Sequence, residues 1–175
     1  MRIGVWDVES TGLDVKEDRI IEFAMIVKDE NGKELDQLVL RICPEKKIAP
    51  KAIATHGIAD ADVAFEKKFA EVASDIYRIV KSCDFLVAHN GAEFDGPMLR
   101  NEFERVGLPD EIPPIFDTMQ NGRGCTHNGK LPNLKELCWA YNVPYDTSKA
   151  HAALYDVEVL SDCFFQALKM GDFTL

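Results

Sequence analysis

The sequence predicts an α/β fold in which helices flank a mixed central β-sheet. Three apolar, strand-like runs follow one another at 2–9, 19–28 and 34–42. A fourth short apolar run, 84–90, comes directly after a helical pattern, as buried parallel strands do. A β-meander followed by alternating helices and strands favours one mixed sheet. With 46% hydrophobic and 29% charged side chains, residues 1–175 are expected to form a single domain.

The first three strands are predicted to be antiparallel neighbours. Residues 2–9 are mostly apolar, and 19–28 is rich in residues that favour strands. Asn31-Gly32 separates the second run from the third, and this dipeptide is a strong hairpin signal. In 34–42 apolar residues alternate with polar ones, as expected for a strand with one exposed face.

The middle of the chain is predicted to combine a loop, two helices and a strand. Residues 44–62 are expected to form a long ordered loop, because buried-looking isoleucines interrupt it. A stripe of apolar residues predicts a helix over 65–83, which leads into the strand at 84–90. The next helix is expected from about 94 to 106, and Gly107 is suited to end it.

The last third adds one strand and two helices. The strand is expected at 115–118. Asn133 and Glu136 have the spacing of a capping box, which predicts a helix that runs through Tyr141. The final helix is expected over 152–169, with an apolar inward face.

Four acidic residues stand where a carboxylate is costly. Asp7 and Glu9 interrupt the apolar first strand, and residues two apart on a strand point to the same face. Asp95 opens a helix after a strand, and Asp156 lies on the inward face of the last helix. Because clustered carboxylates repel one another and resist burial, a cation is expected among them, and oxygen ligands suit Mg²⁺ or Mn²⁺. With His151 as a proton acceptor near neutral pH, the set suits two-metal phosphodiester cleavage.

These residues belong to short motifs that resemble, in order and spacing, those of the DEDD 3′–5′ exonucleases. The histidine spacing is that of the His subclass, and the chain is most similar to the proofreading, epsilon type of DNA polymerase III exonuclease. The resemblance extends over about 1–168. The motifs are Asp7-x-Glu9 with Ser10-Thr11-Gly12-Leu13, His56-Gly57-Ile58, His89-Asn90-x-x-x-Phe94-Asp95 and His151-x-x-x-x-Asp156.

The resemblance implies an RNase H-like fold and the release of nucleoside 5′-monophosphates from 3′ ends. It implies two divalent metal ions, Mg²⁺ or Mn²⁺, and a general base, His151. The implied metal ligands are Asp7, Glu9, Asp95 and Asp156. The residues implied at the terminal nucleotide are Thr11 and Gly12 through their backbone, together with Leu13, His56, Asn90 and Phe94.

Three functions follow from the resemblance and the charge. The net charge is −10, which argues against a general nucleic-acid binder unless bound metals supply positive charge locally. An exonuclease on single-stranded or frayed DNA 3′ ends is favoured, and the same chemistry on RNA ends or short oligoribonucleotides is the alternative. A non-enzymatic structural or proofreading-accessory subunit bound to a polymerase is the third. The absence of the tail by which the replicative subunit binds its polymerase favours a freestanding enzyme, with a polymerase or repair partner as the other reading.

Cysteine usage and the chain's start bear on location. Five scattered cysteines form no CxxC motif, which fits reduced thiols in the cytoplasm better than disulfides. We see neither a signal peptide nor an apolar stretch long enough for a membrane span, so a cytoplasmic protein without membrane contact is expected.

Some conspicuous residues are expected to be structural. Glu22 has no role implied by the family and is expected to be structural or at the rim of the site. Trp6 and Trp139 are expected in the core. Asp60 and Asp62 are expected to cap the helix that follows them.

Overall fold

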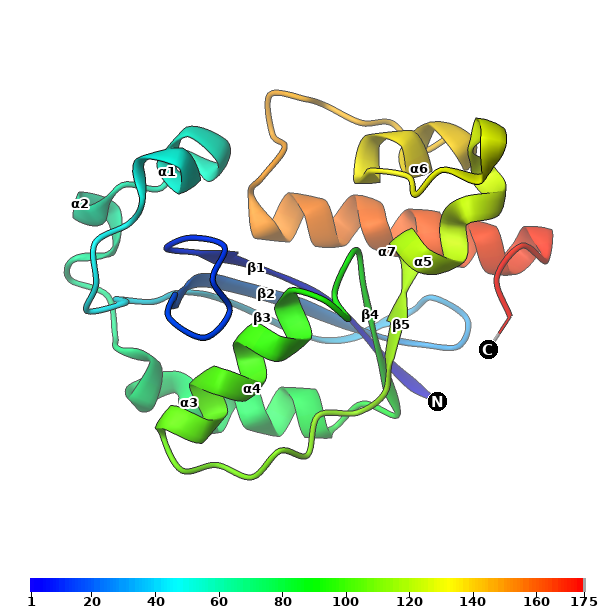
Figure 1. Ribbon diagram of the computed structural model, residues 1–175. Helices are drawn as coiled ribbons and strands as arrows, with labels where there is room; N and C mark the ends of the chain where they lie inside the picture. The colour runs from blue at the N-terminus through cyan, green and yellow to red at the C-terminus, as the bar shows by residue number, and fades with distance from the viewer. Residues whose placement is uncertain (175) are drawn as a thin grey trace.

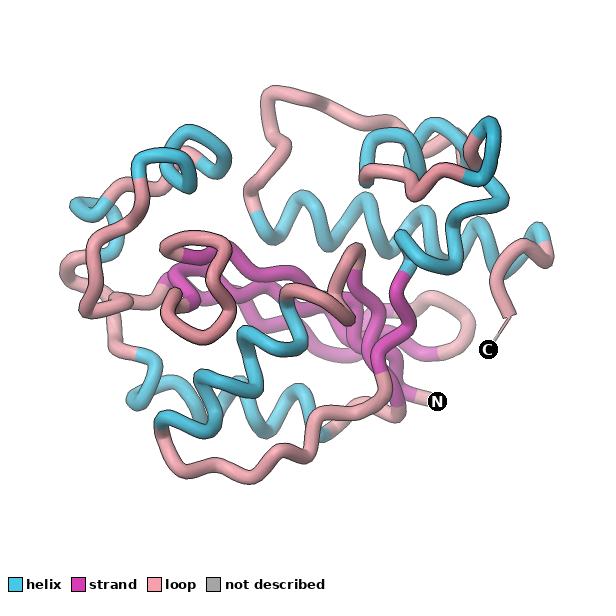
Figure 2. Tube along the Cα trace, in the orientation of Figure 1, coloured by secondary structure: helices cyan, strands magenta, loops and turns pink. Residues whose placement is uncertain are grey.

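A computed structural model describes residues 1–174 and confirms the mixed central sheet (Figures 1 and 2). The sheet has the strand order β3-β2-β1-β4-β5. β1 pairs antiparallel with β2 and parallel with β4, and β4 pairs parallel with β5. The strands are β1 (Arg2–Ser10), β2 (Ile20–Asp29), β3 (Glu34–Arg41), β4 (Phe85–Ala88) and β5 (Ile115–Asp117).

Helices cover both faces of this sheet (Figure 1). α3 and α4 pack on one face, and α6 and α7 pack on the other. No helix in the described part of the chain is both long and apolar enough to cross a membrane. The helices are α1 (Pro50–His56), α2 (Asp60–Val63), α3 (Phe69–Lys81), α4 (Asp95–Arg105), α5 (Thr118–Asn121), α6 (Leu134–Ala140) and α7 (Ala153–Met170), with short 3₁₀ turns at Gly122–Cys125 and His127–Gly129.

The alternation of β1 divides the core into two layers. Trp6 and Val8 pack with α3 and α4, whereas Ile3 and Val5 pack with α6 and α7. The two acids of β1 occupy odd positions like Ile3 and Val5, so they continue the face that α7 covers. The carboxylates of Asp7 and Glu9 therefore point toward the start of α7.

The segment predicted as a long loop contains two short helices, so that prediction was wrong in part. α1 begins at Pro50, a favourable first helical residue, and is terminated by Gly57, the residue after it, whose φ of 75° is left-handed. α2 is a single turn. Helices this short carry too few residues to give an apolar stripe in the sequence, which is why the pattern read as a loop.

The predicted start of the next helix was also wrong. α3 begins at Phe69, where Lys68 N–H donates to the Glu71 carboxylate at 2.8 Å, and Phe65 is fully exposed outside the helix. Asp60 and Asp62 do not cap α3. Asp60 accepts from the Ile48 N–H at 2.9 Å, and Asp62 accepts from Ala59 N–H at the start of α2.

The two tryptophans differ from each other. Trp6 is fully buried, as expected, but the side of α6 that carries Trp139 faces solvent, and this residue is 65% exposed. The expectation that Trp139 belongs to the core was therefore wrong. α6 buries Leu137 and Cys138 instead, which lie on its other face against α7.

Candidate active site

The acidic residues meet because β1 and β4 run parallel. Parallel neighbours end at the same edge of a sheet, so the chain that follows β4 returns beside the end of β1. Asp95, in the first turn of α4, accepts a hydrogen bond from the Val8 N–H at 3.2 Å. This contact ties a carboxylate from one element directly to the strand that carries Asp7 and Glu9.

Glu9, His151 and Asp156 form a compact group of potential metal ligands. Each offers one ligand atom, and these atoms lie within 4.8 Å of one another. Asp156 Oδ2 accepts from the His151 N–H at 3.0 Å, but its buried Oδ1 has no hydrogen-bond partner within the described residues. A buried carboxylate oxygen without a donor is costly, and a divalent cation would satisfy it. The carboxylates of Glu9 and Asp156 therefore fit a hard metal ion.

The pKa values of the four acids are all raised, which reflects the same crowding. Burial raises the pKa of Asp7 well above its usual value, and Asp95 and Glu9 add repulsion. Burial, with repulsion from Asp156 and Glu22, raises the pKa of Glu9 to about 9. Burial likewise raises the pKa of Asp95 to about 7. The pKa of Asp156 is also raised, again chiefly by burial. Ionising all four acids would place more negative charge here than the surroundings neutralise, and a bound cation would offset that charge.

His151 sits at an unusual point of the backbone. Its φ of 64° lies in the left-handed region, which non-glycine residues seldom adopt. The residue is exposed, and its own N–H is held by Asp156. Such a backbone conformation persists where the surrounding structure holds it. At His151 it places the imidazole beside the carboxylates of Glu9 and Asp156.

The sequence reading missed the part that Glu22 has in this arrangement. The Glu22 side chain is almost wholly buried on β2, directly across from Glu9. It accepts from the Ala153 N–H at 3.0 Å and from Arg41 Nε at 3.2 Å. It therefore joins β2 and β3 to the first residue of α7, two positions after His151. The available signal was a single acid within the otherwise apolar stretch 20–27.

A cavity of about 370 Å³ opens beside Glu9. Four of the residues predicted at the terminal nucleotide line it, namely Gly12, Leu13, His56 and Phe94. Leu13 is 86% exposed, so an apolar side chain stands free at the cavity rim. Segments far apart in the sequence thus build one pocket next to the carboxylates.

Thr11 and Asn90 are not among the residues that line this cavity. Thr11 is fully buried: its N–H donates to Arg19 O at 2.9 Å, and its carbonyl accepts from Ala49 N–H at 2.8 Å. Asn90, with a φ of 68°, donates its N–H to Asp117 at 3.2 Å. In this structure both residues hold loops in place.

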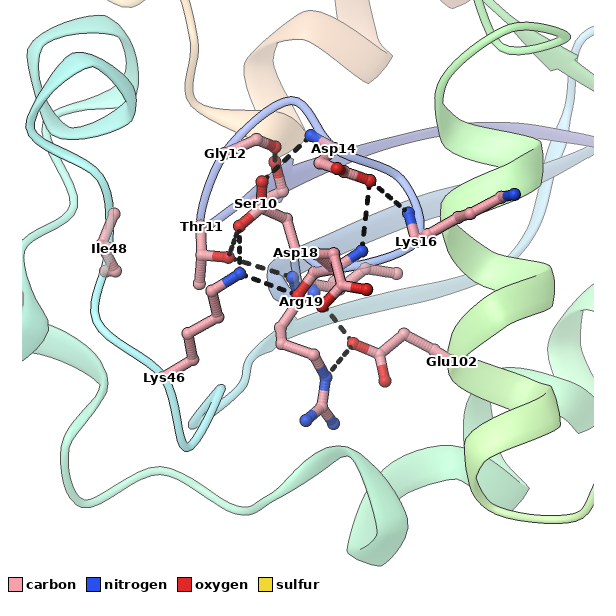
Figure 3. A network of polar contacts seen from close by, with 12 residues as sticks. Ser10, Thr11, Gly12, Asp14, Lys16, Asp18, Arg19, Lys46, Ile48 and Glu102 are labelled. Carbon is pink, nitrogen blue, oxygen red and sulfur yellow. Dashed lines mark hydrogen bonds and ion pairs between the residues drawn. The ribbon is translucent and has the colours of Figure 1, made fainter.

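A network of polar contacts fixes the loop after β1 (Figure 3). Asp18 accepts from the Thr11 hydroxyl at 2.8 Å and from Lys46 Nζ at 2.7 Å. Glu102 accepts from Arg19 Nε at 2.7 Å. A Cβ at Gly12 would lie 2.4 Å from the Asp18 carboxylate, so a side chain there would displace this carboxylate from its partners. The loop therefore presents its backbone to the cavity in one conformation.

His56 is held as a neutral ring. Its Nδ1 accepts from the Ile58 N–H at 3.0 Å, so the proton resides on Nε2, which donates to Ser10 O at 3.2 Å. Burial lowers the pKa of His56, which also favours the neutral form. The ring is therefore a fixed wall of the cavity.

Comparison with known proteins points to one family. A family model described as "RNase_T: Exonuclease" matches residues 5–164. The chain is 30% identical over 165 residues to a PolC-type DNA polymerase III of Halalkalibacterium halodurans, covering 94% of this chain and 11% of that protein. It is 34% identical over 126 residues to the DNA polymerase III subunit epsilon of Haemophilus influenzae, covering 70% of this chain and 48% of that protein. The chain thus spans half or less of the length of these two relatives.

Solved structures support the fold. An exonuclease I structure superposes with a TM-score of 0.83 at 20% identity, covering 96% of this chain and 41% of that one. Escherichia coli exonuclease I in complex with a dT13 oligonucleotide gives a TM-score of 0.82 at 20% identity, covering 98% and 42%. The predicted RNase H-like architecture is therefore confirmed, and the chain belongs to the RNase T family of exonucleases, the DEDD 3′–5′ class that its motifs resemble.

Proposed function

We propose that this chain releases nucleoside 5′-monophosphates from single-stranded or frayed DNA 3′ ends in a metal-dependent, two-metal reaction. The observation that carries the proposal is the group of Glu9, His151 and Asp156, whose ligand atoms lie within 4.8 Å of one another beside a cavity. DNA is favoured because relatives are DNA polymerase III chains, and one structure of the same fold holds a dT13 oligonucleotide.

Asp7, Glu9, Asp95 and Asp156 would hold two divalent ions, Mg²⁺ or Mn²⁺. Their oxygens are hard ligands, their mutual repulsion needs a counter-charge, and the buried Oδ1 of Asp156 has no hydrogen-bond partner among residues 1–174. When bound, such ions lower the pKa of water and stabilise charge on the leaving oxygen.

The cavity beside Glu9 would hold the terminal nucleotide. Leu13 and Phe94 offer apolar surface to the base or sugar, and neutral His56 closes one wall. Gly12 also lines the cavity and, having no side chain, offers its backbone to the sugar. The terminal phosphate would then lie at the acids, because Glu9 belongs to both the cavity and the cluster.

His151 is the proposed general base. A ring nitrogen accepts a proton from the attacking water, whose oxygen bonds to the terminal phosphorus while the bond from phosphorus to the upstream 3′ oxygen breaks. The 3′ oxygen leaves with the upstream chain and takes up a proton from solvent. Because His151 is exposed, its ring can pass the accepted proton to bulk water.

The test is a gel assay on 5′-labelled single-stranded DNA beside RNA of the same sequence, with Mg²⁺, Mn²⁺ or EDTA. We expect a metal-dependent ladder that shortens from the 3′ end, faster on DNA, and lost in Asp156→Asn. Asp162→Asn is the matched control, because Asp162 is an exposed acid on the same helix.

Three results would contradict parts of the proposal. A faster RNA ladder would assign the enzyme to RNA ends. Cleavage that persists in EDTA would show that the reaction does not need metal ions. No cleavage of either strand by the folded protein would favour an accessory subunit, and binding to a replicative polymerase would then be the next measurement.

A further inference from the structure

A second cavity, of about 430 Å³, opens beside His151 and Asp156. Its lining includes His151 and Asp156, together with Lys135 and Tyr145. The first cavity shares Glu9 with the cluster, and the second shares its remaining two members. The potential metal ligands therefore stand where the two cavities meet.

An exposed tryptophan lies next to this second cavity. Trp139 is 65% exposed, and Lys135 Nζ lies 4.8 Å from the centroid of its ring. The two residues are four apart on α6, so they lie on one face of that helix. Lys135 lines the same cavity as His151 and Asp156, so its position over the indole places a solvent-facing ring beside that cavity.

We propose that Trp139 and Lys135 bind the upstream nucleotides of a single strand whose 3′ end occupies the first cavity. This inference rests on the proposed function, since it extends the same substrate across the cluster. An indole stacks on bases of any sequence, and an ammonium beside it pairs with the backbone phosphate. Trp139 and Lys135 thus supply local affinity for a polyanion on a protein whose net charge is −10.

The position of the site gives it a distinct kinetic signature. The terminal nucleotide and its phosphate contact the first cavity and the acids, whereas Trp139 meets only nucleotides beyond the bond that breaks. A substrate without upstream nucleotides therefore never reaches Trp139. The p-nitrophenyl ester of thymidine 5′-monophosphate is such a substrate, because nitrophenolate leaves where the upstream chain would.

The experiment compares this ester with a single-stranded oligothymidylate in Mn²⁺. Trp139→Ala should raise the KM for the oligonucleotide about tenfold, the usual effect of one lost base stack. The KM for the ester should stay within about twofold of its value in the unsubstituted protein. Trp139→Phe should restore most of the loss. Phe65→Ala is the matched control, because Phe65 is an exposed aromatic that is not among the residues lining the two cavities.

Lys135→Ala should make the dependence of log KM on log salt shallower by about one phosphate contact.

A binding measurement provides a readout without turnover. The chain has two tryptophans, and Trp6 is fully buried, so fluorescence that responds to a stacked base should come from Trp139. Oligothymidylate added in EDTA should quench this emission in the unsubstituted protein and not in Trp139→Phe.

The outcomes separate the two proposals. An oligonucleotide KM unchanged in Trp139→Ala, with both substrates still cleaved, would overturn the upstream site and leave the exonuclease intact. Equal losses on the ester and the oligonucleotide would also overturn it, because the substitution would then act on the catalytic site. Failure of the unsubstituted protein to cleave either substrate would overturn the proposed function itself.

Discussion

At the scale of single residues, the ionisation of Glu9 links the site to stability. Its pKa is raised from 4.5 to about 9 in the folded protein, so between these values the folded state binds more protons than the unfolded chain. Stability without metal should therefore fall as the pH rises from about 5 to 9, because each proton lost leaves a buried, repelled charge. Thermal unfolding in EDTA across this range measures the effect.

Glu9→Gln should reduce that pH dependence, since the substituted side chain does not ionise, and the remainder should come from Asp7, Asp95 and Asp156, whose pKa values are also raised. Glu158→Gln, at an exposed acid of α7, should leave it unchanged. A melting temperature that stays level from pH 5 to pH 9 in the unsubstituted protein would contradict the raised pKa.

His151 should matter for turnover more than for metal binding. Removing a positioned general base typically lowers the rate about 10²–10⁴-fold, so His151→Ala should lower kcat by that factor. The Mn²⁺ affinity of His151→Ala, measured by titration, should stay close to that of the unsubstituted protein, because the carboxylates remain. His127→Ala, at an exposed histidine in a 3₁₀ turn, is the control. A kcat for His151→Ala equal to that of the control would assign the proton to another acceptor.

At the scale of elements, the start of α7 should depend on Glu22. Its carboxylate accepts from both Ala153 N–H and Arg41 Nε, and a glutamine would offer only one acceptor oxygen. A small displacement of a catalytic group can cost up to about 100-fold in rate. Glu22→Gln should therefore lower kcat about tenfold with little change in KM for the p-nitrophenyl ester, while circular dichroism remains native.

A companion substitution tests the same anchor from its other partner. Arg41→Ala should lower kcat in the same direction, because the freed Glu22 oxygen no longer has a fixed donor. If both variants retain full kcat, the apolar packing of α7 is enough to position its start, and the contacts of Glu22 do not affect catalysis.

The elements also show what the sequence could and could not predict. Strands and long helices were predictable, because strand alternation and helical stripes extend over many residues in β2, α3 and α7. α1 and α2 were not, since four to seven residues give no stripe. Trp139 was misplaced because hydrophobicity alone does not tell which face of a short helix meets solvent. The hydrogen bond between Glu22 and Ala153 joins residues 131 positions apart, a pairing that only the folded chain displays.

At the scale of the whole molecule, charge and fold combine. The chain carries a net charge of −10. Helices cover both faces of the central sheet (Figure 1), and the contacts among β1, α4 and α7 bring several acids together at one edge of it. Burial of these acids opposes folding, whereas bound cations would offset it. The stability of the entire domain should therefore depend on the metal ions that the reaction uses.

Mn²⁺ should raise the melting temperature of the unsubstituted protein. A ligand at 100 times its Kd stabilises the folded state by about 2.7 kcal/mol, and 1 kcal/mol shifts a domain of this size by about 2–4 °C. We expect an increase of about 5–10 °C. In Asp7→Asn the protein without metal should already melt higher, because one repelled charge is gone, and the response to Mn²⁺ should shrink. Asp162→Asn should retain the full response, and a melting temperature indifferent to Mn²⁺ in all three proteins would mean that the converging acids do not bind metal.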